Sequence, residues 1–108
     1  MKPPAYSPVF AALYAPLCDI ARAHGYALVV HGTMQLDFDL VAIPWTEQAT
    51  EPKELVLAIA KRLDLLNDTF GTGIDPTPEI KPHGRLAWLL YFGCGAQIDL
   101  SVMPRQKT

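Results

Sequence analysis

The chain has 108 residues, half of them hydrophobic, and a formal net charge of −2. This length fits one domain, residues 1–108, with a single core, and the apolar content argues against disorder outside the ends. No basic cluster is present, which argues against binding to duplex nucleic acid, because neutralising phosphates needs grouped Lys and Arg. No apolar run approaches the length of a membrane span, and the N-terminus lacks the order of a signal peptide, so we expect a cytoplasmic protein with no membrane partner.

A helix is the first element that the sequence predicts. Ser7 and Pro8 suit a helix start, because Ser caps the free N–H groups and Pro fits the first turn. Apolar residues then recur at helical spacing as far as Ala21, and Gly25 is a typical residue for the cap at the C-terminal end. Pro16 falls inside this pattern and predicts either a kink or a division of the helix.

Two strands follow this helix. Apolar residues predict the first strand at 27–30 and the second at 37–43. Successive side chains of a strand point to opposite faces, so Asp37 and Asp39 share one face while Phe38 enters the core. Two carboxylates at this spacing repel each other, and a divalent cation with oxygen ligands is the simplest group to sit between them.

The second half of the chain predicts one helix and two further strands. Residues 53–66 repeat apolar side chains along one helical stripe, and the turn residues at 67–85 predict a loop. Residues 86–92 and 97–102 then predict strands joined by a tight turn. The order of the elements favours an α+β fold, with a small four-stranded mixed sheet and both helices packed on one of its faces. Tryptophans are expected in the core or at its rim, at positions 45 and 88.

A third carboxylate lies in the last predicted strand. Asp99 alternates there with Ile98 and Leu100, which places it on the face away from the core. If this strand lies beside the strand of Asp37 and Asp39, the three carboxylates form a site for a hard cation such as Mg²⁺ or Mn²⁺. Two such ions can hold the attacking and the leaving oxygen during phosphoryl or nucleotidyl transfer, and one Asp can serve as a base.

At these residues the chain resembles the DNA-polymerase-β-like nucleotidyltransferase superfamily. That family has an apolar strand ending in Gly-Ser or Gly-Gly, then an Asp-x-Asp strand, then a third Asp on a later strand. The matching stretches here are residues 29–33, 37–40 and 97–100. In size the chain is closest to the minimal nucleotidyltransferase domains, which often act with a partner chain. The family fold is a short mixed sheet backed by helices, in agreement with the order of the elements.

The resemblance implies a site and a reaction. Asp37, Asp39 and Asp99 would bind Mg²⁺ or Mn²⁺ and form the catalytic set, and Gly32 with Thr33 would approach the triphosphate. The reaction would transfer a nucleoside monophosphate from a nucleoside triphosphate to a hydroxyl acceptor, with pyrophosphate leaving. Cleavage of a phosphodiester with water as the nucleophile uses the same ions and stays an open alternative.

A departure from the family pattern favours a different reading. Only Met34, Gln35 and Leu36 separate Thr33 from Asp37, where the family usually has a longer segment that often opens a helix. The alternative to an enzyme is therefore a catalytically inactive module that keeps the fold. Such a module would bind a protein partner, a second copy of the chain or a phosphorylated ligand.

A small cationic group precedes the third predicted strand. It comprises Lys81, His83 and Arg85, and Gly84 allows the backbone to approach a ligand closely. The planar guanidinium of Arg matches phosphate, and His titrates near neutral pH. We therefore predict that these side chains bind phosphate, the alternative being a solvated loop. His31, beside the glycine turn, is a further candidate for a functional residue. The alternative is a residue at the end of the strand that only forms a hydrogen bond to the backbone.

Overall fold

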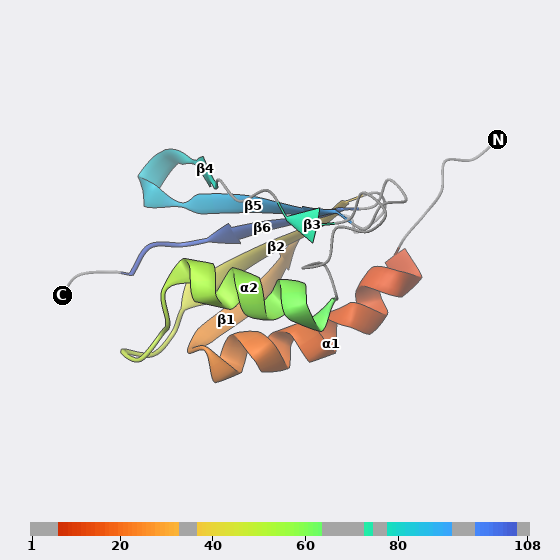
Figure 1. The fold of residues 1–108 in the computed structure, drawn as a ribbon, viewed down its shortest axis with the longest axis horizontal. Helices are drawn as coiled ribbons and strands as arrows, with labels where there is room; N and C mark the ends of the chain where they lie inside the picture. Colours follow the sequence, from red (N-terminus) through yellow and green to blue (C-terminus); the bar gives the residue numbers. More distant parts are fainter. Residues whose placement is uncertain (1–6, 33–36, 64–72, 75–77, 92–96, 106–108) are drawn as a thin grey trace.

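The structure is a computed structural model, and it describes residues 7–32, 37–63, 73–74, 78–91 and 97–105. Predictions that fall on Thr33, on residues 64–72 and on residues 92–96 lie outside these ranges. The elements follow one another along the chain as helix, two strands, helix, and then four strands (Figure 1). Their bounds are α1 (Ser7–Ala23), β1 (Tyr26–His31), β2 (Asp37–Pro44), α2 (Pro52–Arg62), β3 (Gly73–Ile74), β4 (Glu79–Ile80), the 3₁₀ turn η1 (Pro82–Gly84), β5 (Leu86–Tyr91) and β6 (Gln97–Val102).

The strands form one mixed sheet, which confirms the predicted α+β class. Their order is β1-β2-β6-β5-β3, and β4 also pairs with β5. β2 and β6 are parallel, whereas the other pairs are antiparallel. The predicted count of four strands is wrong, because β3 and β4 extend the sheet within the stretch expected to be a loop. Each has two residues, too few for an alternating pattern to reveal a strand in the sequence.

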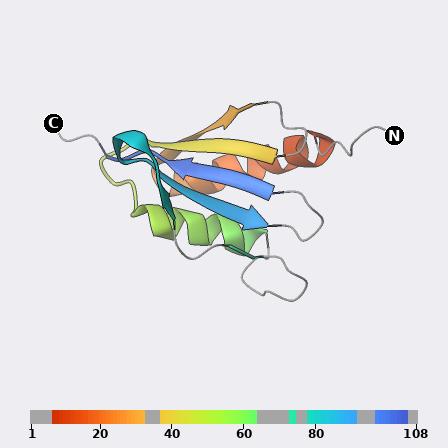
Figure 2. The ribbon, with the colours of Figure 1, turned by 90° about the horizontal axis from the view of Figure 1, so that it is seen from above.

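Both helices lie on the same side of this sheet, as Figure 1 and Figure 2 show. Alternation along each strand decides which side chains meet them. Phe38, Leu40 and Ala42 of β2 are buried on the helix side, next to their register partners Ile98, Leu100 and Val102 of β6. The core is completed by Ala49 and, from the helices and the flanking strands, by Phe10, Leu17, Ala21, Tyr26, Leu28, Leu55, Val56, Ile59, Ala60, Trp88 and Leu90.

Aromatic contacts join α1 to the sheet. The ring of Phe10 stacks on Phe38 with centroids 4.9 Å apart, and Tyr14 meets Phe38 edge to face. The Tyr14 hydroxyl also donates a hydrogen bond of 2.7 Å to the carbonyl oxygen of Leu28 in β1. The helix continues through Pro16, so the predicted division does not occur. These contacts hold the part of α1 that precedes the proline against the sheet.

The ends of the helices depend on local backbone chemistry. Gly25 follows α1 with a φ of +85°, and its N–H donates to the carbonyl oxygen of Arg22. This left-handed conformation suits glycine, and it confirms the predicted cap. Helix α2 ends at Arg62, earlier than predicted, and Leu63 leaves the helical conformation at φ −90° and ψ 2°. Neither helix, within the described residues, has the length and apolar character needed to cross a membrane.

Candidate functional site

The face of the sheet opposite the helices carries a row of polar residues across three neighbouring strands. Asp39 of β2 is the register partner of His31 on β1 and of Asp99 on β6. Because neighbouring strands lie about 4.8 Å apart, the two aspartates stand side by side and point to the same face. His31 is exposed at the end of the row. The structure therefore brings together two of the three predicted carboxylates.

Asp37 lies on the same face but one repeat further along β2. Its register partner is Gln97, and its side chain is exposed. The rise along a strand separates Asp37 from Asp39 by about 7 Å at the α-carbons. Among the described residues no three His, Cys, Asp or Glu side chains converge closely enough to hold a metal ion. The Asp39–Asp99 pair is thus assembled, whereas a three-carboxylate group is not.

Asp99 sits in an environment that disfavours its negative charge. Burial raises the pKa of the Asp99 carboxyl above its ordinary value of 3.8, and the neighbouring charge of Asp39 raises it further. Lys81 and Arg85 act in the opposite direction, and Glu79 adds a smaller upward contribution. A cation bound beside this pair would relieve both the repulsion and part of the cost of burial.

Lys81 and Arg85 of the cationic group come near Asp99 because the chain folds back over the open face. The segment of β4 and η1 lies on the side of the sheet away from the helices, in both Figure 1 and Figure 2. The N–H of Lys81 donates to the carbonyl oxygen of Arg85 at 2.7 Å, which closes the turn. His83 has a φ of +66° and Gly84 one of +77°, so the turn uses left-handed backbone at its tip.

The three predicted phosphate contacts differ in where they lie. Lys81 and Arg85 act electrostatically on Asp99, so both lie near the pair. Lys81 also forms an ion pair of 3.0 Å with Glu79. His83 is exposed, and no hydrogen bond or ion pair joins it to another described residue.

Glu79 is a site residue that the sequence analysis missed. It is the register partner of Ala87 on β5, at the edge of the same open face. A signal was present in the sequence, because Glu79 and Lys81 are two residues apart, and such residues share a face in extended backbone. The turn residues around it predict a loop, and in a loop alternation does not indicate a shared face.

Gly32 lies directly against the pair. Its φ is +95°, and a Cβ added at this position would come within 2.9 Å of Oδ2 of Asp39. Glycine thus supplies the left-handed backbone and also the room in which the Asp39 carboxylate lies. The predicted contact of Gly32 with a triphosphate stays a prediction, and Thr33 lies outside the described residues.

The donor set of this face fits a magnesium ion completed by a substrate. Mg²⁺ in proteins is commonly held by one or two carboxylates, with water and substrate phosphate oxygens filling the other positions. Asp39 and Asp99 supply two carboxylates from adjacent strands, and the positive charges of Lys81 and Arg85 act on Asp99. A comparison of the chain with protein-family models, curated proteins and solved structures finds no match.

Proposed function

We propose that this chain is a metal-dependent nucleotidyltransferase-like domain that binds a nucleoside triphosphate on the open face of its sheet. The observation that carries the proposal is the in-register pair Asp39–Asp99 with Lys81 and Arg85 beside it. Paired carboxylates next to a guanidinium and an ammonium are the groups that bind a divalent cation together with phosphate.

The balance of charge supports a cation as the first ligand. Four carboxylates lie on this face or at its edge, namely Asp37, Asp39, Asp99 and Glu79, against the two cations Lys81 and Arg85. Four negative and two positive charges leave an excess of two negative charges, which one divalent ion would neutralise. A triphosphate without a metal would meet net repulsion here, so nucleotide binding should depend on the metal.

Each residue has a distinct role in this proposal. Asp39 and Asp99 would hold Mg²⁺ or Mn²⁺, and the bound ion would stabilise charge on the transferring phosphorus. Arg85 would bind phosphate oxygens through its planar fork, and Lys81 would bind them as a point charge. Asp99, the more buried of the two aspartates, would also accept the proton of the attacking hydroxyl. Asp37 completes the predicted set at the exposed end of the face.

The second candidate is a module that binds a phosphorylated ligand or a protein without turnover. It is favoured by the finding that no three potential ligands converge among the described residues. The two candidates differ in a measurable way, because a module tolerates the loss of a carboxylate that a catalyst needs.

Release of pyrophosphate from each nucleoside triphosphate, with Mg²⁺ or Mn²⁺, tests the proposal. Water serves as a slow acceptor, and a mixture of hydroxyl acceptors is added in parallel. We expect metal-dependent release that falls by at least about 10²-fold in Asp39→Asn and in Asp99→Asn, as when one electrostatic stabiliser is lost. Asp19→Asn, an exposed change on α1, is the matched control and should not alter the rate.

The outcomes separate the candidates. If nucleotide binds in a metal-dependent manner but no pyrophosphate is released with any acceptor, the module is correct. If no nucleotide binds with or without metal, both candidates fail as nucleotide sites. A dinucleotide offered as substrate distinguishes transfer from phosphodiester cleavage, since only cleavage releases a monophosphate from it.

A further inference from the structure

A groove runs between α1 and α2, on the opposite side of the sheet from the carboxylate pair. It has a volume of about 510 Å³ and is open to solvent rather than enclosed. Its lining comes from the C-terminal half of each helix and from the residue after α1, and comprises Ile20, Ala23, His24, Ala58, Lys61 and Arg62. Nothing in the proposed nucleotide site uses these residues.

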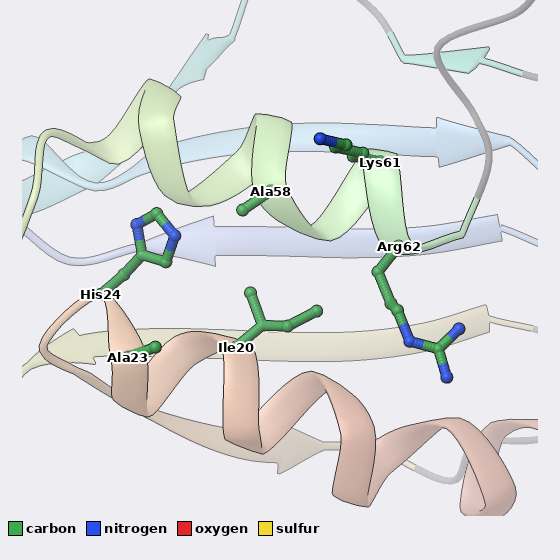
Figure 3. A pocket seen from close by; sticks show the side chains of 6 residues that line it. All are labelled: Ile20, Ala23, His24, Ala58, Lys61 and Arg62. Carbon is green, nitrogen blue, oxygen red and sulfur yellow. The ribbon is translucent and has the colours of Figure 1, made fainter.

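The groove has an apolar floor with nitrogen-bearing side chains at both ends. Figure 3 shows Ile20 and Ala58 facing each other across its middle, with His24 at one end and Arg62 at the other. Ala23 and Ala58 have small side chains, and Ile20 supplies the larger apolar surface of the floor. An apolar ligand segment could therefore lie against both helices at once.

The polar ends of the groove are available for a ligand. Nδ1 of His24 is hydrogen-bonded to Oγ1 of Thr50 at 3.0 Å, so Nε2 is the ring atom left for another partner. Neither Lys61 nor Arg62 makes an ion pair with any residue in the described part of the chain. Both are exposed. The groove thus offers donors and positive charge without a carboxylate in its lining.

We propose that this groove binds one amphipathic helix of a partner protein, with apolar residues along one stripe and acidic residues flanking it. A helix laid across two helices presents side chains at i, i+3, i+4 and i+7, which suits the narrow apolar floor. Carboxylates beside the apolar stripe would meet Arg62 near one end of the groove and His24 near the other, and Lys61 adds positive charge on α2.

Two features favour a helix over a small amphiphile such as a fatty acid. A fatty acid has one anionic head, whereas the groove has donors at both of its ends (Figure 3). Sites for small molecules usually bury most of the ligand surface, and an open groove does not. A helix needs only one face covered, so the shape and the charge of the groove agree on the same occupant.

Binding of a panel of designed helical peptides to the full chain tests this proposal. The peptides share one leucine stripe and differ only in the flanking residues, which are Glu, Gln or Lys. We expect the Glu peptide to bind with a Kd below about 100 µM and at least about tenfold more tightly than the Lys peptide. Added salt should weaken the Glu peptide most, because its flanking contacts are exposed.

Variants on the two helices locate the binding site. Arg62→Glu should weaken the Glu peptide at least about tenfold and strengthen the Lys peptide, and Ala23→Glu should weaken the Glu peptide by adding both bulk and charge. Lys53→Glu makes the same change of charge on α2 outside the groove, and it should leave binding unchanged. Positions 23, 53 and 62 are exposed, and melting curves verify that each variant folds.

Specific results would overturn the proposal. They are equal binding of the Glu and Lys peptides, no binding of any peptide below about 1 mM, or equal effects of Arg62→Glu and Lys53→Glu. Laurate is the probe for the small amphiphile, and laurate binding that Ala23→Glu weakens, with no peptide binding, would identify that class of ligand instead. None of these measurements depends on the nucleotide site, so the two proposals succeed or fail separately.

Discussion

Asp39 and Asp99 are register partners on the parallel strands β2 and β6, and alternation with their buried neighbours places both on the face of the sheet away from the helices. They come from positions 60 residues apart in the chain, since 99 minus 39 is 60. Holding two like charges side by side destabilises the folded state. Such an arrangement is expected where a bound ligand compensates the charge.

The raised pKa of Asp99 predicts how stability changes with pH. The folded state binds the Asp99 proton more tightly than the unfolded chain does. The contribution of Asp99 to the free energy of unfolding therefore falls as pH rises from 3.8 through the raised folded-state pKa. Asp99→Asn removes this cost. We expect its melting temperature to exceed that of the wild type near neutral pH, with the difference closing below about pH 3.8. Asp19→Asn is the control, and an Asp99→Asn variant that melts lower at neutral pH would contradict the prediction.

Two glycines with positive φ should differ in how much stability alanine costs. A Cβ on Gly25 would come within 2.7 Å of the backbone Cα of Ala49, whereas on Gly32 its closest contact is the Asp39 carboxylate, which can move. We expect Gly25→Ala to cost about 2–3 kcal/mol of unfolding free energy and Gly32→Ala about 1–2 kcal/mol. Chemical denaturation measures both losses. The reverse order would show that the clash of the added Cβ with Ala49 does not determine the loss of stability at Gly25.

The stacking of Phe10 on Phe38 predicts a large effect of a core truncation. Phe38 is fully buried beneath α1. Phe38→Ala therefore removes the ring and leaves a cavity in the core. We expect a loss of about 3–5 kcal/mol in the free energy of unfolding. Val29→Ala on the open face, where Val29 is 45% exposed, should cost less than about 1 kcal/mol. Similar losses of unfolding free energy in the two variants would contradict the packing of α1 on Phe38.

Arg85 should act on the nucleotide and not on the metal. Arg85→Ala is expected to raise the Kd for a nucleoside triphosphate with Mg²⁺ by about tenfold, because one charge-assisted contact to phosphate is lost. Binding of the metal alone should not weaken, since Arg85 repels a cation. Arg22→Ala, an exposed change on α1, is the control. An equal effect of the two substitutions on nucleotide affinity would show that Arg85 does not contact the nucleotide.

The parts of the fold that the sequence predicted are those with a long periodic pattern. α1 and β6 show repeats that extend over several residues, so their faces and approximate bounds could be read in advance. The parity of Asp39 and Asp99 followed from the same alternation. That β2 lies next to β6 was a hypothesis, because the pairing of strands distant in the chain depends on packing across the whole core.

Other features depend on contacts that no local pattern reveals. The approach of Lys81 and Arg85 to Asp99 requires β4 to pair with β5 and the turn to fold over the sheet. Trp88 is buried, as predicted, but Trp45 is 79% exposed, so the packing prediction is wrong for it. Trp45 comes directly after Pro44, where β2 ends, and therefore leaves the alternation that decides burial within the strand.

Titration of metal-free protein with Mn²⁺, followed by calorimetry and by melting temperature, tests the Asp39–Asp99 site most directly. We predict saturable binding that raises the melting temperature of the wild type, because a ligand that binds only the folded state stabilises it. Asp39→Asn and Asp99→Asn should each weaken binding at least about tenfold, since each removes one of two charged ligands. Asp19→Asn should match the wild type. Binding that is absent in the wild type, or equal in all four proteins, would contradict the assignment of this pair as the metal site.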